Sequence, residues 1–283
     1  MLRLSMHTDN WRCLSGSFRQ ACEAAKRFGL EFIEFGVVDG QDFIQGLGYS
    51  PAVSLESNPI EVRRYLDSMG LRPSQTDAAY PITGPAGATW GVRYAQRAIQ
   101  FAHLIGCPRV DTTDGQFKPE GYTDQEVMAI TRENYRQILK WAEDFQVVVN
   151  IETHGPYTND PELLDQMLHF FDTPWLGFNL DTGNTFIAGG NPVDFLERFL
   201  PKLNYVHVKD VSPGLAAALR GEDTGIAMSE SPIGQGVNAA NIAECIRRLK
   251  EADWDGILSV ECLGTDENLQ ASIAWLRDQI GQG

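Results

Sequence analysis

The sequence is poor in positive charge. It has 23 Lys and Arg residues against 38 Asp and Glu, which gives a formal net charge of −15 at pH 7. A field of that sign repels a phosphate backbone, and no run of like charges suggests an interaction tail. The composition therefore disfavours a nucleic-acid partner.

Disulfide motifs and long apolar runs are also missing. The five cysteines are scattered, odd in number and form no CxxC pair, which is typical of reduced thiols. No stretch approaches the ~18 consecutive apolar residues of a membrane-spanning helix, and MLRLSMHTDNWR at the start has no signal-like apolar core. We therefore expect a cytoplasmic protein with no membrane partner. The cysteines are Cys13, Cys22, Cys107, Cys245 and Cys262.

Short apolar runs alternate with amphipathic segments along the whole chain. A helix is predicted after Asn58, with Pro59 at its first position and Gly70 at its end. Eight such strand–helix units predict a parallel sheet, and closure into a single (β/α)8 TIM barrel over residues 1–283 is the usual way to complete that number. An open doubly wound sheet is the alternative, weakened because no GxGxxG follows the first strand. The predicted strands are 2–7, 32–38, 71–78, 109–114, 147–154, 176–182, 205–211 and 256–263.

The segment 212–237, after the seventh predicted strand, is too long for a simple turn. We expect it to form a lid or a subunit contact, which is compatible with a homo-oligomer or a hetero-oligomer with a second subunit.

Ionisable residues recur at the ends of the last four predicted strands: Glu152, Asp181, His207 and Glu261. In a parallel barrel the C-terminal ends of all strands meet on one face. Three carboxylates alone would repel one another, whereas a divalent cation would coordinate all three together with the imidazole. Oxygen ligands with one imidazole suit Mn²⁺, Mg²⁺ or Co²⁺, and Zn²⁺ is also compatible.

Other residues are expected on the same face. His154 follows Glu152 by two positions and should share its side of the strand, and Lys209 stands in the same relation to His207. Lys209 would hold a substrate oxygen or form a salt bridge to Asp181 or Glu152. Asp210 points the other way and should be structural.

Three residues of the first two predicted units are weaker candidates for contacts with the substrate. His7 ends the first predicted strand, Trp11 follows it in a loop, and Glu34 lies on the second strand, where it would touch substrate or orient a ligand.

The motifs NIETH, NLDTGN, YVHVKD and SVECLG resemble the metal-binding set of the xylose-isomerase-like superfamily. The resemblance implies a divalent metal, Mn most readily, and a small-molecule keto sugar, cyclitol or oxo-glycoside as substrate. In the ketose 3-epimerases of this group the first and last glutamates are both ligands and acid–base groups. By that resemblance Glu152 and Glu261 would remove and return a proton beside the ketone, giving isomerisation or epimerisation.

Two features depart from the epimerase pattern. Asn184 stands where those enzymes carry a histidine, and His154 adds a base that they lack. This pattern resembles the lyase and dehydratase branches, which include inosose dehydratases and catalytic subunits that cleave 3-oxo-glycosides and C-glycosides. Endonuclease-type repair is disfavoured by only five histidines and the charge of −15, and a non-catalytic partner subunit is disfavoured by the intact ligand set.

Overall fold

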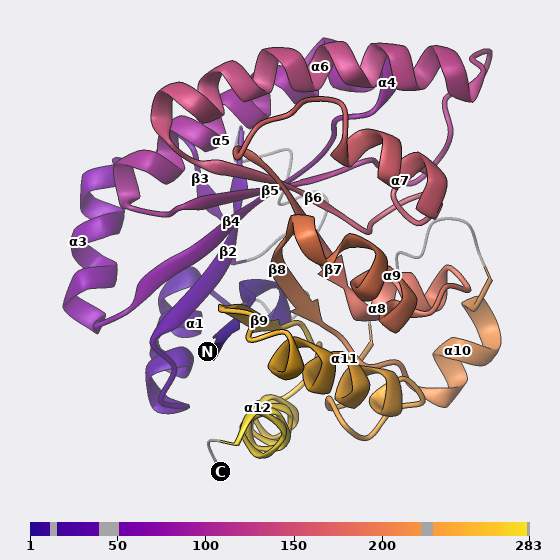
Figure 1. Ribbon diagram of the computed structural model, residues 1–283. Coiled ribbons are helices and arrows are strands. Elements are labelled where there is room, and N and C mark those ends of the chain that lie inside the picture. Colours follow the sequence, from indigo (N-terminus) through magenta and orange to yellow (C-terminus); the bar gives the residue numbers. More distant parts are fainter. Residues whose placement is uncertain (12–15, 40–50, 222–228, 282–283) are drawn as a thin grey trace.

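The computed structural model describes residues 1–11, 16–39, 51–221 and 229–281. Within them, parallel strands form one curled sheet in the order β1-β9-β8-β7-β6-β5-β4-β2-β3. A single parallel bridge between His7 and Glu34 joins the first strand to the second and closes the barrel (Figure 1). The strands are β1 (Leu2–Met6), β2 (Phe32–Val38), β3 (Val53–Ser54), β4 (Arg72–Pro81), β5 (Arg109–Thr113), β6 (Val148–Glu152), β7 (Leu176–Asp181), β8 (Leu203–Val208) and β9 (Gly256–Val260).

The TIM-barrel prediction is confirmed, and eight of these strands begin and end within three residues of the predicted bounds. The addition is β3, a two-residue strand that pairs with the end of β2. Its brevity explains why periodicity did not predict it, since two residues contain no alternation to read.

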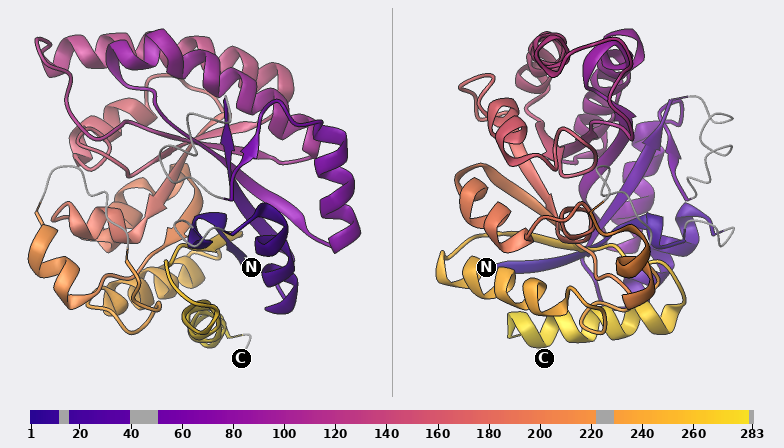
Figure 2. Two further views of the ribbon diagram at one scale, coloured as in Figure 1. Left: turned by 180° about the vertical axis from the view of Figure 1, so that it is seen from behind. Right: turned by 90° about the vertical axis from the view of Figure 1, so that its right-hand side faces the viewer.

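Helices cover the outside of the barrel, with α6 along one side and α11 and α12 at another (Figures 1 and 2). Local sequence sets their ends: α6 begins with a reciprocal capping box between Thr123 and Glu126, and Pro59 opens a helix that Gly70 ends in a left-handed conformation at φ 71°. The α-helices are α1 (Phe18–Arg27), α3 (Pro59–Met69), α4 (Gly84–Ala86), α5 (Val92–Ile105), α6 (Asp124–Phe145), α7 (Pro161–Leu168), α8 (Thr182–Ile187), α9 (Pro192–Phe199), α10 (Pro213–Leu219), α11 (Ala239–Glu251) and α12 (Asp266–Ile280). The short turns are η1 (Thr8–Trp11), the π-helical η2 (Gly87–Gly91) and η3 (Leu200–Lys202).

The apolar core lies between the sheet and these helices, whereas polar side chains fill much of the barrel interior. No helix in the described part of the chain is long and apolar enough to span a membrane.

The segment after β8 is tied to the barrel by Asp210. Its buried carboxylate accepts hydrogen bonds from the backbone N–H groups of Gly234, Gly236 and Asn238 at 2.8–3.0 Å. Asp210 therefore has the structural role expected from the sequence. The predicted lid or subunit contact at 212–237 begins with α10, and its residues 222–228 lie outside the described part of the chain.

Asp210→Ala should loosen this segment, because the backbone N–H groups of Gly234, Gly236 and Asn238, together with that of Val211, lose their acceptor. We expect the free energy of unfolding to fall by about 2–4 kcal/mol, with faster amide hydrogen exchange at residues 234–238, measured by thermal denaturation and mass spectrometry. Asp255→Ala, which removes a carboxylate whose side chain is 68% exposed, is the control. Unchanged exchange in Asp210→Ala would contradict this assignment.

Candidate active site

The structure brings the four strand-end residues together. Glu152 and Asp181 are the last residues of β6 and β7, His207 lies near the end of β8, and Glu261 directly follows β9. One ligand atom from each lies within 4.8 Å of those of the other three. Register explains the meeting, since Asp181 pairs with His207 across β7 and β8.

His207 lies between carboxylates on both sides of its ring. Nε2 donates to Glu34 Oε1 at 2.8 Å, while Nδ1 is 3.0 Å from Glu152 Oε1 and 3.5 Å from Glu261 Oε2. Burial alone would lower the pKa of this imidazole, but the charge of Glu34 and the hydrogen bond to Glu152 outweigh burial and raise the pKa well above its usual value.

Lys209 supplies positive charge within the cluster. Nζ lies 2.9 Å from Asp181 Oδ2 and 2.8 Å from Glu261 Oε1, and it donates to Asn184 Oδ1 at 3.0 Å. The salt bridge to Asp181 that the sequence offered as an alternative is therefore present. Burial would lower the pKa of Lys209, but the charges of Asp181 and Glu261 raise it instead, so the side chain is an ammonium ion.

Glu152 and Glu261 occupy electrostatically different positions. Burial raises the pKa of Glu152 to about 8, despite its contact with His207. Burial acts in the same direction on Glu261, but there Lys209 outweighs it and holds the pKa far below the usual range. Without a metal, Glu152 therefore holds its proton more tightly than Glu261 does.

Asn184 lies in the site at the start of α8. Asp181 is the N-cap of that helix and accepts the Asn184 backbone N–H at 2.8 Å. The Asn184 side-chain amide lies between Glu152 and Lys209. It donates to Glu152 Oε1 at 3.4 Å and accepts from Lys209 Nζ. The short helix α8, capped by Asp181, thus positions the Asn184 side chain beside Glu152 and Lys209.

The weaker candidates have varied placements. His7 and Glu34 form a second group with His207, in which the potential ligand atoms again lie within 4.8 Å of one another. Trp11 is 8% exposed and packs in the apolar core rather than in an open loop. His154 is half-buried just beyond the end of β6, and its imidazole is not one of the four clustered ligand groups.

Two buried acids were missed by the sequence reasoning. Asp77 on β4 lies opposite Asp111 on β5. Oδ2 of Asp77 is 3.6 Å from Nε2 of His7. Asp111 is wholly buried, its carboxylate accepts no hydrogen bond from any described residue, and burial together with the charge of Glu152 raises its pKa well above the usual value. The signal was available, because both acids interrupt predicted strands as the four cluster residues do.

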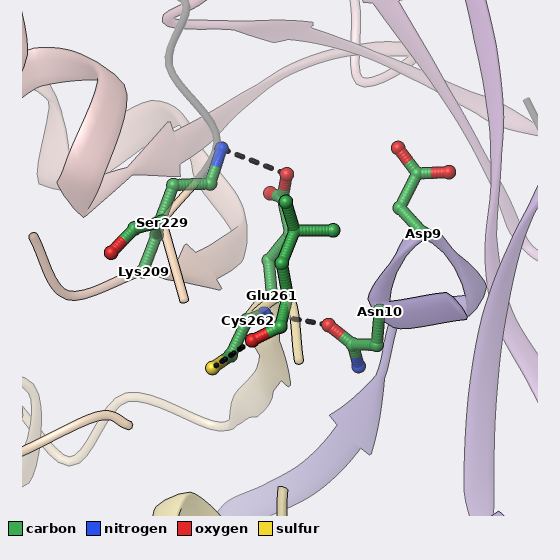
Figure 3. A pocket seen from close by; sticks show the side chains of 7 residues that line it. Asp9, Asn10, Lys209, Ser229, Glu261 and Cys262 are labelled. Carbon is green, nitrogen blue, oxygen red and sulfur yellow. Dashed lines mark hydrogen bonds and ion pairs between the residues drawn. The ribbon is translucent and has the colours of Figure 1, made fainter. Parts of the chain in front are cut away.

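A small pocket opens beside the ionised edge of the cluster. Lys209 and Glu261 contact each other in its lining, with Nζ 2.8 Å from Oε1 (Figure 3). Asn10 helps to shape the opposite wall, where its side chain accepts the backbone N–H of Cys262 at 2.6 Å. The lysine–glutamate pair is thus the part of the cluster that borders this pocket.

Residues 22–279 match the family described as xylose isomerase-like TIM barrel. Among curated proteins, an uncharacterised protein of Methanocaldococcus jannaschii, MJ1311, is 26% identical over 129 residues, which is 44% of this chain and 40% of that protein. An inosose dehydratase of Clostridium botulinum is 26% identical over 68 residues, 24% of this chain and 23% of the enzyme. The matches therefore span less than half the length of these curated relatives.

Solved structures share the fold over nearly the whole chain. The probable 3-DHS dehydratase AsbF of Bacillus anthracis has a TM-score of 0.73 at 22% identity, covering 97% of this chain and 98% of its own. A D-tagatose 3-epimerase-like protein has a TM-score of 0.76 at 19% identity, with 99% and 97% covered. The IOLI protein with a bound zinc atom has a TM-score of 0.75 at 14% identity, with 99% and 98% covered.

Lys209→Met should destabilise the metal-free protein strongly, because it leaves Asp181 and Glu261 buried without their cation. Removing one partner of a buried ion pair costs about 3–5 kcal/mol, which chemical denaturation would measure. Lys140→Met, at an exposed position of α6, is the matched control and should change the free energy of unfolding by less than about 0.5 kcal/mol. Equal stability of the two variants would contradict the charge-balancing role of Lys209.

Proposed function

Because the chain belongs to the xylose isomerase-like TIM-barrel family, we propose that it is a divalent-metal-dependent enzyme that removes a proton from the carbon beside a ketone. The substrate class is a sugar or cyclitol, and return of the proton gives isomerisation or epimerisation. The main support is the convergence of Glu152, Asp181, His207 and Glu261, one ligand atom of each lying within 4.8 Å of those of the other three.

The donor set fits a divalent cation. Three carboxylates and one imidazole converge, and Oε2 of Glu261 accepts no hydrogen bond from the described residues. Glu152, Asp181, His207 and Glu261 would hold the ion, with Mn²⁺ as the first choice and Mg²⁺, Co²⁺ or Zn²⁺ also compatible. When bound, such an ion polarises the ketone and stabilises the enediolate. The zinc in the IOLI protein is consistent with this proposal.

The protein's own groups divide the proton transfers. Glu261, ionised beside Lys209, would remove the proton from substrate, and Glu152 would return a proton to the opposite face. Lys209 borders the pocket, so its ammonium group would hold the oxygen on which negative charge develops. Asn184 would keep Lys209 and Glu152 in place through its two hydrogen bonds.

Elimination of a β-substituent is the second candidate reaction, making the enzyme a lyase or dehydratase acting on an inosose or a 3-oxo-glycoside. Its support is Asn184, bonded to Lys209 where ketose 3-epimerases would place a histidine. The partial similarity to an inosose dehydratase is in agreement. His154 would be the additional base.

The reaction is tested by NMR on Mn²⁺-supplied protein in D₂O, with ketoses, inososes and 3-oxo-glucosides as substrates. We expect deuterium at the carbon beside the carbonyl of a product stereoisomer or positional isomer, and a rate lowered about 10²–10⁴-fold in Glu152→Gln and Glu261→Gln, because each loses an acid–base group. His154→Gln is the matched comparison and should retain exchange. Release of water or an aglycone would favour elimination, whereas no exchange in metal-loaded protein would refute both reactions.

Metal affinity should rise with pH beyond the range of an ordinary imidazole. Both His207 and Glu152 have raised pKa values, so a cation must displace protons from these ligands at neutral pH. The apparent affinity should therefore increase above pH 7, where a histidine of usual pKa, about 6.5, would already be deprotonated, by up to about tenfold per pH unit for each proton displaced. Calorimetric titration with Mn²⁺ between pH 6 and 9, in two buffers of different ionisation enthalpy, measures both affinity and proton release. An affinity that is constant above pH 7 would contradict this expectation.

A further inference from the structure

A chain of buried side-chain hydrogen bonds runs through the barrel beneath the four-residue cluster. Arg109 Nε donates to Asn204 Oδ1 at 2.6 Å, and Asn150 Nδ2 donates to the same oxygen at 3.4 Å. Asn150 Nδ2 also donates to Gln75 Oε1 at 2.6 Å, and Gln75 Nε2 donates to Glu34 Oε1 at 2.8 Å. The chain thus connects the starts of β5 and β8 to the glutamate that accepts from His207.

The two ends of this chain fix the orientation of every amide in it. A guanidinium group only donates and a carboxylate only accepts hydrogen bonds. Arg109 therefore requires the oxygen of Asn204 to face it, and Glu34 requires the nitrogen of Gln75 to face it. If the Gln75 amide were reversed, its nitrogen would face the nitrogen of Asn150 and its oxygen would face the carboxylate of Glu34. Two donors or two acceptors in contact are unfavourable in a low-dielectric interior.

The barrel wall leaves room for the chain at β7. A Cβ atom on Gly177 would lie 2.5 Å from Asn150 Oδ1 and 2.9 Å from the Cβ atom of Asn204, both closer than atoms can pack. Glycine at this position of a strand is otherwise unfavourable. Its presence is explained by the two asparagine side chains that occupy the space beside it.

Carboxylates approach both nitrogens of the His207 ring, but those at Nδ1, Glu152 and Glu261, belong to the four-residue cluster that would bind the metal, whereas Glu34 at Nε2 does not. The Asn179 amide nitrogen lies 3.3 Å from Nδ1 and 3.4 Å from Nε2, so it favours neither. Glu34 approaches only Nε2, and a carboxylate there requires the proton on Nε2. Nδ1 is then the nitrogen that faces Glu152 and Glu261.

We propose that Gln75 is a positioning residue for the metal site, anchored by Arg109 at the opposite face of the barrel. By donating to Glu34 it holds that carboxylate in the orientation that keeps a proton on Nε2 of His207 and leaves Nδ1 to the metal. The inference rests on the proposed function, because it assigns His207 as a ligand. It goes beyond that function by placing control of the ligand in a hydrogen-bond chain whose amide side chains lie outside the four-residue cluster.

Gln75→Met tests the proposal, since methionine has a similar length but donates no hydrogen bond. We expect Mn²⁺ binding, measured by calorimetry, to weaken about 10–100-fold. In ¹⁵N–¹H spectra of the Zn²⁺-loaded protein, the wild type should show one slowly exchanging Nε2–H proton on His207, and the variant should exchange it at least tenfold faster. Ser74→Ala is the control: Ser74 is equally buried, its hydroxyl bonds only to groups outside the chain, and the backbone carbonyl that accepts from Arg109 is kept in the variant, so Mn²⁺ affinity should stay within about twofold.

The distant anchor gives a second test that does not open the barrel core. Arg109 is half-buried, so Arg109→Met should fold even where Gln75→Met does not. It should weaken Mn²⁺ binding a few-fold, and Arg109→Lys, which can still donate to Asn204, should restore it. Wild-type affinity in both Gln75→Met and Arg109→Met would overturn the positioning role while leaving the metal site intact. Absence of Mn²⁺ and Zn²⁺ binding by the wild type would instead refute the proposed function.

Discussion

The compensation of buried negative charge is the constraint on which the rest of the site depends. Six of the carboxyl groups at the barrel mouth lie close to one another, and Lys209 together with His207 provides the facing positive charge. Burying an unpaired charge is so unfavourable that the remaining groups must retain protons or meet a cation. In the metal-free protein, the raised pKa values of Glu152 and His207 mean that these groups retain protons. The convergence of the ligand atoms suits the alternative, in which a bound cation balances the charge. The acids are Glu34, Asp77, Asp111, Glu152, Asp181 and Glu261.

The two proposed reactions share their first step and would use the same geometry. Proton removal beside a ketone needs one ionised carboxylate and a nearby positive charge, which Glu261 and Lys209 would provide. The product would then depend on whether the second group returns a proton to carbon or assists a leaving group. Glu152 lies inside the cluster, whereas His154 lies outside it. Under this proposal the cluster would favour return of the proton, and a leaving group would have to lie toward His154.

Much of the fold and half of the site could be predicted from sequence, for identifiable physical reasons. Short apolar runs separated by amphipathic segments predicted the strands. Because the strands were expected to be parallel, their C-terminal ends were expected to bring Glu152, Asp181, His207 and Glu261 together. Asp77 and Asp111 were missed because only the last four strands were compared. His154 was expected to share the face of Glu152, but strand alternation ends where β6 ends, so its imidazole lies outside the cluster. The amide chain below the site was beyond prediction, since partners such as Gln75 and Asn150 depend on barrel register.

The closure of the barrel has a consequence for synthesis of the protein on the ribosome. β1 pairs with β9 over five residues, from Leu2 to Met6, but meets β2 through one bridge. Within this barrel β1 must therefore wait for β9, and Glu261 emerges after β9. Until then, the polar groups of the nascent barrel interior have no complete set of partners. Vectorial folding of this chain should thus end in one late docking event, during which chaperone protection matters most.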